Sequence, residues 1–336
     1  THCISSAASD VYKRQHFTPA LKNALKQQGI ARTLYDDTNL HALINLCSRR
    51  LQRQFEQRDI QFLRLYLQYC LLAHQLGFTP AFAPLQQAWA EARAEYLVAH
   101  EIIRHWQRRV VPIPHVSEHL FLAVLFMLLR TPDPIRDSHQ QDTRLREAIH
   151  RTIERFRALS GMDFSDEQGL TDQLYIHLAQ ALNRSLFGIG IDNTLPEEIT
   201  LLYPRLMRTT REALTCLEEE YSLCFTHEEA GLVAVIFGAW LMQESDLHEK
   251  QVVLLTDDAP ERERAIEEQL RELTLLPLNI KYLPLATFQQ EGAPREAALI
   301  VTPYVTPLPL FSAPLIHAVI TLSEQQQRHI RDMLES

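Results

Sequence analysis

The feature that most constrains the fold of this chain is an internal duplication. Residues 118–129 read EHLFLAVLFMLL, and residues 228–241 read EEAGLVAVIFGAWL. The same parts precede each of these segments, namely an amphipathic helix, a second helix and a long polar helix. Two copies of one unit that each end in a nearly all-apolar helix predict two tandem helical bundles, with the apolar helix at the centre of each.

The first copy is predicted to span residues 36–131. It begins at DDTN, 36–39, where any of the four side chains can cap a helix. Residues 39–57 carry apolar side chains at steps of three and four, which predicts the first helix, and 58–77 predict the second. A long helix is expected from about Leu85 to Arg109, because this stretch is rich in Ala, Glu, Arg and Gln.

The second copy is predicted to span residues 142–246, after a polar stretch with two prolines that marks the boundary. Residues 143–161 match the first helix of the unit, and 169–189 match the second. Pro196 is expected to open a long helix, 196–221, that precedes the apolar one.

The last part of the chain, 250–336, has a different pattern. The apolar run VVLLT is the first of four strand candidates, and the others lie in 279–285, 297–305 and 315–322. Amphipathic helices are expected at 261–273 and after Ser323, which is a good N-cap. Strands separated by helices predict a small parallel α/β sheet, so that the chain as a whole is mainly α.

The first residues need separate treatment. THCISSAASDVYKRQ lacks an initiator Met and an apolar core, and it resembles a translated adapter sequence at the start of a metagenomic fragment. We therefore interpret 1–15 as a non-native leader and expect the true N-terminus to be missing. Residues 16–35 are predicted to form a basic linker helix, which is either a connector from an N-terminal helix-turn-helix region or a solvated lead-in.

Composition excludes several classes of protein. The net charge of −9 argues against a surface that coats nucleic acid. Five cysteines without a CxxC pair are typical of a reducing cytoplasm, and we expect Cys47, Cys70 and Cys216 to lie reduced in the core. The apolar run at 120–129 is too short to span a membrane. Neither a P-loop, nor GxSxG, nor GxGxxG is present.

One histidine stands out. In GLTDQLYIHLAQALNRSLFGI, Leu170, Leu174, Leu178 and Leu182 recur every four residues and mark an inward face, and His177 lies beside it. An imidazole at that margin is either a hydrogen-bonded core residue or a group that exchanges a proton or a phosphoryl group.

The pattern L-x-x-H-L-x-x-A-L-x-R, followed by F-G-I-x-I-x-N and L-x-x-E, resembles a PRD, the phosphotransferase-system regulation domain of bacterial transcription regulators. Segments such as DDTNL, HWQRR, LVAVIFGAWLMQ and LRELTLLPLNIK extend a resemblance to this family over nearly the whole chain. The resemblance implies two tandem helical-bundle modules, PRD 1 at 36–131 and PRD 2 at 142–246.

The resemblance also implies a modification site. PRDs accept phosphate on histidines, one in the second helix and one in the last helix of each module, and His177 matches the second-helix position of PRD 2. The other positions fall at Leu67 or Gln68, at Leu125 and at Ile236. None of these is a histidine, so we expect none of them to accept phosphate from the phosphocarrier proteins of the phosphotransferase system. Arg184, seven residues after His177, is either a phosphate-supporting residue or a solvated arginine.

Residues 250–336 resemble the degenerate enzyme IIB-like domains that follow PRDs in some regulators. Those domains carry phosphate on a cysteine after the first strand, whereas this chain has Thr256-Asp257-Asp258-Ala259-Pro260 there and no cysteine after Cys224. Two aspartates would repel a phosphoryl donor, so we expect a docking or packing module.

These observations predict a cytoplasmic PRD-containing regulator that senses phosphotransferase-system or carbon status through phosphorylation of His177. The implied partners are phosphocarriers of HPr or enzyme IIB type, a second copy bound through the PRDs, and DNA only through a missing N-terminal domain. We expect no membrane association, no cofactor and no metal, since His115 with His119 and His100 with His105 lack a third ligand. The alternative is an interaction protein that is not phosphorylated and in which His177 is structural; an enzyme is disfavoured because no nucleophile–base pair is evident.

Overall fold

The computed structural model describes residues 45–51, 81–107, 116–129, 132–138, 140–188, 195–244, 250–275, 278–307 and 312–335. The chain divides into two compact units, the first made of 1–137 with 176–190 and the second of 138–175 with 191–336. The division falls inside one helix, between Tyr175 and Ile176. In the described residues of 81–129 and 140–244 all regular structure is helical, as predicted, and superposition of the two modules stays a prediction.

The described part of the first unit contains helical residues 45–50, helices α5 (Pro84–Glu91), α6 (Ala94–Gln107) and α7 (Val116–Leu129), and the C-terminal part of α9 (Glu167–Phe187). Residues 120–127 of α7 are all buried, which fits the central position predicted for the apolar helix. Ala90, Leu120, Val124, Met127 and Phe187 form one apolar cluster.

The long helix predicted from Leu85 to Arg109 is wrong, because α5 and α6 are separate. Helix α5 ends at Glu91 with Ala92 as its C-cap, and the chain turns through Arg93, whose N–H donates to the Ala90 carbonyl at 3.1 Å. The guanidinium group of Arg93 lies 4.5 Å from the centre of the Trp89 ring. Since neither glycine nor proline marks this break, tertiary packing has overridden helix propensity here.

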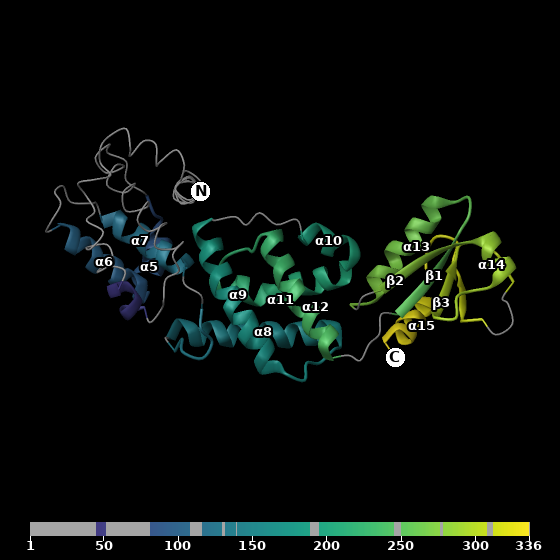
Figure 1. Ribbon diagram of the computed structural model, residues 1–336, viewed down its shortest axis with the longest axis horizontal. Coiled ribbons are helices and arrows are strands. Elements are labelled where there is room, and N and C mark those ends of the chain that lie inside the picture. The colour runs from purple at the N-terminus through teal and green to yellow at the C-terminus, as the bar shows by residue number, and fades with distance from the viewer. Residues whose placement is uncertain are drawn as a thin grey trace, which may run out of the picture. The chain divides into compact units, whose positions relative to one another are not determined.

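The second module contains helices α8 (Gln140–Ser160), α9 (Glu167–Phe187), α10 (Leu195–Leu202), α11 (Pro204–Tyr221) and α12 (His227–Glu244) (Figure 1). The single long helix predicted from Pro196 is wrong as well. It breaks at Tyr203, which has φ −134° and ψ 57°, because Pro204 disfavours helical geometry in the residue before it. Pro204 then takes the first position of α11, where its missing N–H costs nothing.

Three phenylalanines form the aromatic centre of the second module. Phe156 of α8 and Phe237 of α12 are stacked with ring centres 4.0 Å apart, and Phe164 lies 6.0 Å from both. Phe156 and Phe237 are completely buried. On the surface, Arg151 of α8 pairs with Glu220 of α11 at 2.6 Å, and Arg155 pairs with Glu212 at 2.7 Å.

Asp166 caps the N-terminus of α9, because its Oδ1 accepts the N–H of Gly169 at 2.9 Å. Asp166→Ala is expected to lower the free energy of unfolding by about 1 kcal/mol, the usual value of such a cap. Chemical denaturation followed by circular dichroism measures this change. Asp163→Ala, in the same loop but 86% exposed, is the matched control and should have a smaller effect. Equal losses for the two variants would contradict the capping role.

The C-terminal part contains a four-stranded parallel sheet of order β2-β1-β3-β4. The strands are β1 (Lys250–Thr256), β2 (Leu278–Pro284), β3 (Ala297–Thr302) and β4 (Leu315–His317). The predicted parallel sheet is confirmed, although its fourth strand has three residues only.

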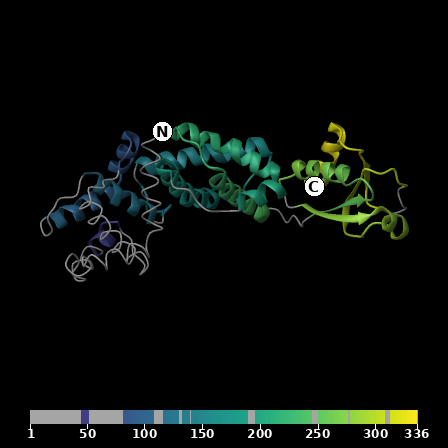
Figure 2. The same ribbon diagram turned by 90° about the horizontal axis from the view of Figure 1, so that it is seen from above.

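Helices cover both faces of this sheet. Val252, Leu254 and Leu299 share an apolar cluster with α13 (Pro260–Leu273) and α15 (Glu324–Glu335). Figure 2 shows these two helices, green and yellow, on the same side of the strands. The opposite face, with Val253 and Ile300, packs on Phe288 of α14 (Leu285–Glu291). Ser323 is the N-cap predicted for α15, since its Oγ accepts the N–H of Gln326 at 3.3 Å.

Candidate functional site

The candidate phosphoacceptor His177 lies in the middle of α9. Leu170, Leu174 and Leu178 are completely buried and Leu182 is 2% exposed, which confirms the predicted inward face. The His177 side chain is half-buried, and its Nε2 atom is buried. A phosphoryl donor can therefore reach Nε2 only after the ring rotates or a neighbouring segment moves.

The C-terminal half of α9 packs on α5 and α7. The indole N–H of Trp89 donates to Asn183 Oδ1 at 3.0 Å, and Gln86 Nε2 donates to the Leu186 carbonyl at 3.0 Å. Phe187 joins the apolar cluster with Leu120 and Val124. These contacts fix the helix that carries His177.

Arg184 is half-buried on α9, seven residues after His177. That separation is about 10 Å along the helix axis, so Arg184 is on a similar face but two turns away. Gly188 follows the helix with a φ of +63°, a left-handed conformation that favours glycine. Asp192 and Asn193, at the end of the F-G-I-x-I-x-N pattern, lie outside the described residues.

Two of the other family positions fall in the helical cores. Leu125 of α7 is 1% exposed, and Ile236 of α12 is 9% exposed. The remaining position, Leu67 or Gln68, lies outside the described residues. Both described positions thus hold buried hydrocarbon side chains that stabilise their modules.

The loop after β1 is held by groups from its own domain. The carboxylate of Glu263 accepts the Asp257 N–H at 2.7 Å and the Tyr304 hydroxyl at 2.6 Å, and the Ala259 N–H donates to the same hydroxyl at 2.9 Å. Burial, and then the Glu263 contact, raise the pKa of Tyr304. Ligands of parallel sheets usually bind at this edge, and here side chains of the domain already occupy the loop amides.

Of the four histidines considered as metal ligands, the two whose side chains are described, His100 and His119, lie next to each other. His100 and His119 lie with ring centres 5.0 Å apart at an interplanar angle of 81°. Burial, and then the charge of His100, lower the pKa of His119 to about 4. His115 and the side chain of His105 lie outside the described residues. Within the described ranges, no three His, Cys, Asp or Glu side chains are grouped as metal ligands.

The cysteine predictions hold in part. Cys47 is free and buried, and burial raises the pKa of its thiol to about 12. Cys216 is free but only half-buried, because it lies on the partly exposed face of α11. Cys70 lies outside the described residues.

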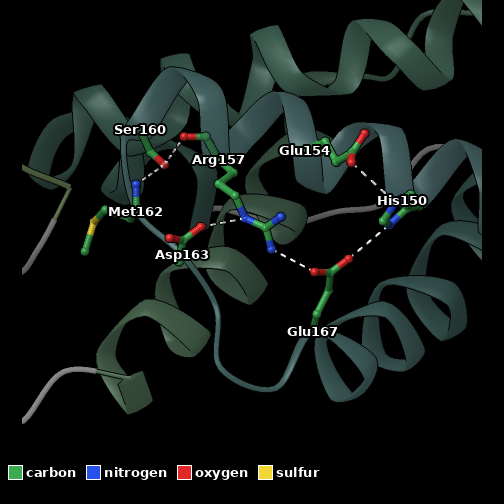
Figure 3. Close-up of polar contacts among 7 residues, drawn as sticks. All are labelled: His150, Glu154, Arg157, Ser160, Met162, Asp163 and Glu167. Carbon is green, nitrogen blue, oxygen red and sulfur yellow. Dashed lines mark hydrogen bonds and ion pairs between the residues drawn. The ribbon is translucent and has the colours of Figure 1, made fainter.

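A polar cluster that sequence reasoning missed lies where α8 faces the start of α9 (Figure 3). His150 contacts Glu154 on its own helix and Glu167 on the next, and Arg157 pairs with Glu167 at 2.7 Å. The i,i+4 spacing of His150 and Glu154 is visible in the sequence. The contact with Glu167 depends on how two helices pack, and no periodicity reveals it.

Comparisons with known proteins match these parts of the chain. A family model of the PRD domain matches residues 41–128 and 150–240. A second family model, the C-terminal domain of the stationary phase-inducible protein CsiE, matches residues 250–334. None of the helices in the described ranges has the length and apolar character needed to cross a membrane.

Two curated relatives agree with these matches. The chain is 65% identical to the stationary phase-inducible protein CsiE of Escherichia coli over 321 residues, which are 95% of this chain and 75% of that protein. It is 29% identical to the transcriptional regulator ManR of Bacillus subtilis over 113 residues, 33% of this chain and 17% of that regulator. The chain therefore belongs to the CsiE family and contains two PRD domains.

Proposed function

We propose that this protein is a non-enzymatic regulator that senses phosphotransferase-system or carbon status through phosphorylation of His177 in its second PRD. The observation that carries the proposal is the match of two PRD domains, the second of which has His177 on α9. The similarity to a transcriptional regulator supports a role in transcription, which the chain would exert through DNA bound by a further domain.

The chemistry at His177 would be an attack by a neutral ring nitrogen on a phosphoryl group carried by a phosphocarrier of HPr or enzyme IIB type. The product gains nearly two negative charges at the margin of an apolar helix face. Arg184, two turns further along α9, would support the phosphate by charge. Because Nε2 is buried in the resting state, phosphorylation would be coupled to a movement around α9.

Through this movement, phosphorylation of His177 would change how α9 packs on its neighbouring helices. Asn183, Leu186 and Phe187 fix the same helix against α5 and α7, so a displaced His177 would disturb that packing. In a cytoplasmic homodimer formed through the PRDs, the disturbance would change the subunit interface. Whether phosphorylation strengthens or weakens the dimer depends on whether the phosphorylated or the unphosphorylated conformation forms the better interface.

The buried Nε2 also favours a second candidate function. In that case His177 is a structural residue, and the protein is an interaction module that is not phosphorylated. The two candidates differ in one measurable property, the transfer of phosphate from a carrier.

The test is incubation of the purified chain with labelled phosphoenolpyruvate, enzyme I and a phosphocarrier, followed by peptide mapping at alkaline pH. Trypsin cleaves after Arg157 and Arg184, so His177 lies in its own peptide, 158–184. We expect acid-labile phosphate on this peptide in the wild type and none in His177→Ala. The matched control is His227→Ala, an exposed histidine at the start of α12, which should keep the phosphate. An unlabelled 158–184 peptide in the wild type would contradict the proposal.

A further inference from the structure

A second histidine of the PRD 2 module lies in a more accessible environment than His177. His150 is on α8, outside the four family positions, and its side chain is 56% exposed. It lines an open cavity of about 730 Å³ with Arg146, Arg151 and Thr171. A carrier protein can therefore approach this ring without any movement of the helices.

One ring nitrogen of His150 is oriented by a carboxylate. Nδ1 lies 3.0 Å from Oε1 of Glu167, and a carboxylate can only accept a hydrogen bond, so Nδ1 carries the hydrogen. In the neutral ring the lone pair is then on Nε2, the nitrogen that acts as a nucleophile. Carboxylates orient metal-binding and catalytic histidines in the same manner.

Glu167 is itself held in place. Nη2 of Arg157 donates to its Oε2 at 2.7 Å, and this bond is the main cause of the lowered pKa of Glu167 (Figure 3). Glu167 is thus a carboxylate at neutral pH with one oxygen on Arg157 and the other on His150. Glu167 of α9 thus connects two residues of α8, His150 and Arg157, by one contact each.

The other ring nitrogen is only loosely contacted. Nε2 lies 3.5 Å from Glu154, which is longer than an ordinary hydrogen bond, and Glu154 is 57% exposed. An incoming phosphoryl group would repel Glu154, which can turn into solvent. Arg146 and Arg151 line the same cavity. The Arg151 guanidinium is paired with Glu220 at 2.6 Å, and the Arg146 guanidinium lies 4.6 Å from the centre of the Tyr175 ring. Either group would bind a phosphoryl oxygen by sharing or exchanging these contacts.

We propose that His150 is a second phosphoacceptor of this protein, with Glu167 as its positioning residue. In the step, the Nε2 lone pair forms the N–P bond while the bond between phosphorus and the carrier's phosphorylated atom, a histidine nitrogen of HPr or a cysteine sulfur of an enzyme IIB-type carrier, breaks. The electron pair returns to the carrier, and the hydrogen stays on Nδ1, which continues to donate it to the Glu167 carboxylate. The ring becomes cationic as the N–P bond forms, and the Glu167 carboxylate stabilises that charge. The proposal rests on the proposed function only in sharing its phosphocarriers.

The test uses the same labelling reaction on the full chain and compares two peptides. Trypsin cleaves after Arg146 and Arg151, so His150 lies in the peptide 147–151, apart from His177. We expect acid-labile phosphate on 147–151 in the wild type and in His177→Ala, and none in His150→Gln. In the His150→Gln variant the 158–184 peptide serves as an internal control of folding and of carrier activity.

Two matched variants test the positioning role. Glu167→Gln should slow phosphorylation of His150 by about tenfold or more, the usual effect of losing an orienting carboxylate. Glu154→Gln, which changes the carboxylate near the other nitrogen, should leave the rate unchanged or raise it. If the two carboxylates have only a structural role, their substitutions should change the phosphorylation rate of His150 to the same extent. Equal rates in the two variants would therefore overturn the positioning role of Glu167.

The outcomes separate this inference from the proposed function. Phosphate on 158–184 alone overturns the His150 site and supports His177 as the acceptor. Phosphate on 147–151 alone supports the His150 site and overturns His177. Phosphate on neither peptide, with a carrier that is itself phosphorylated, overturns both.

Discussion

Phe237→Ala should lower the free energy of unfolding of the second helical module by about 3–5 kcal/mol, the usual cost of removing a large aromatic side chain from a core. Phe237 is completely buried and stacks on Phe156 with ring centres 4.0 Å apart. Its removal leaves a cavity beside Phe164, which also contacts the ring. Since domains are typically stable by 5–15 kcal/mol, this loss would bring the module close to unfolding at ambient temperature.

Chemical denaturation of the full chain, followed by circular dichroism and by tryptophan fluorescence, measures the Phe237 effect. Trp240 lies on the same helix and reports on this module. The matched control is Met242→Ala on α12, because the Met242 side chain is 51% exposed. It should change stability by no more than about 0.5 kcal/mol. Equal losses for Phe237→Ala and Met242→Ala would show that the aromatic stack is not central to the module.

The second large effect is a loss of stability in acid that depends on His119. Burial lowers the pKa of this histidine from 6.5 to about 4 in the folded protein. Between these two values the unfolded chain binds a proton that the folded chain does not bind, so folding becomes less favourable as the pH falls below 6.5. From pH 7 to pH 5 the first unit should lose about 2 kcal/mol of stability through this one group.

Denaturation at pH 7 and pH 5 for the wild type and for His119→Gln isolates that contribution. Other titrating groups affect both proteins, so the difference between the two pH dependences belongs to His119 and its neighbour His100. The variant should be about 2 kcal/mol less sensitive to the same pH change. A pH dependence identical to that of the wild type would show that the pKa of His119 is the same in the folded and in the unfolded chain, which would contradict this prediction.

The features that were predictable from the sequence depend on the local spacing of apolar residues and on residues that cap or interrupt helices and strands. The four leucines beginning at Leu170 lie on the buried face of α9, and the apolar residues 120–127 are all buried. Alternation of apolar strands with amphipathic helices predicted the parallel sheet, and the preference of serine for the N-cap position predicted the Ser323 cap. Each of these features is signalled by a pattern among residues that are close in the sequence, so one amino-acid sequence is sufficient to predict it.

Features that depend on packing between distant segments were not predictable. The break at Ala92 has no glycine or proline to mark it. The break at Tyr203 is different, because it is local: Pro204 disfavours helical geometry in the residue before it, so the sequence contains the signal for this break. The burial of His177 Nε2 and the contact between His150 and Glu167 arise only when helices meet. A histidine's chemistry follows from the groups around it, and its position in a motif does not determine them.

The most direct measurement is the intact mass of the wild-type chain, and the phosphate on its tryptic peptides, after incubation with phosphoenolpyruvate, enzyme I and HPr. The same mixture without HPr is the control. A protein that senses phosphotransferase-system status should gain phosphate only in the complete mixture, and peptide 158–184 should carry it on His177. A chain whose mass stays unchanged with fully phosphorylated HPr, and also with a phosphorylated enzyme IIB-type carrier, would contradict this function and leave an interaction protein that is not phosphorylated.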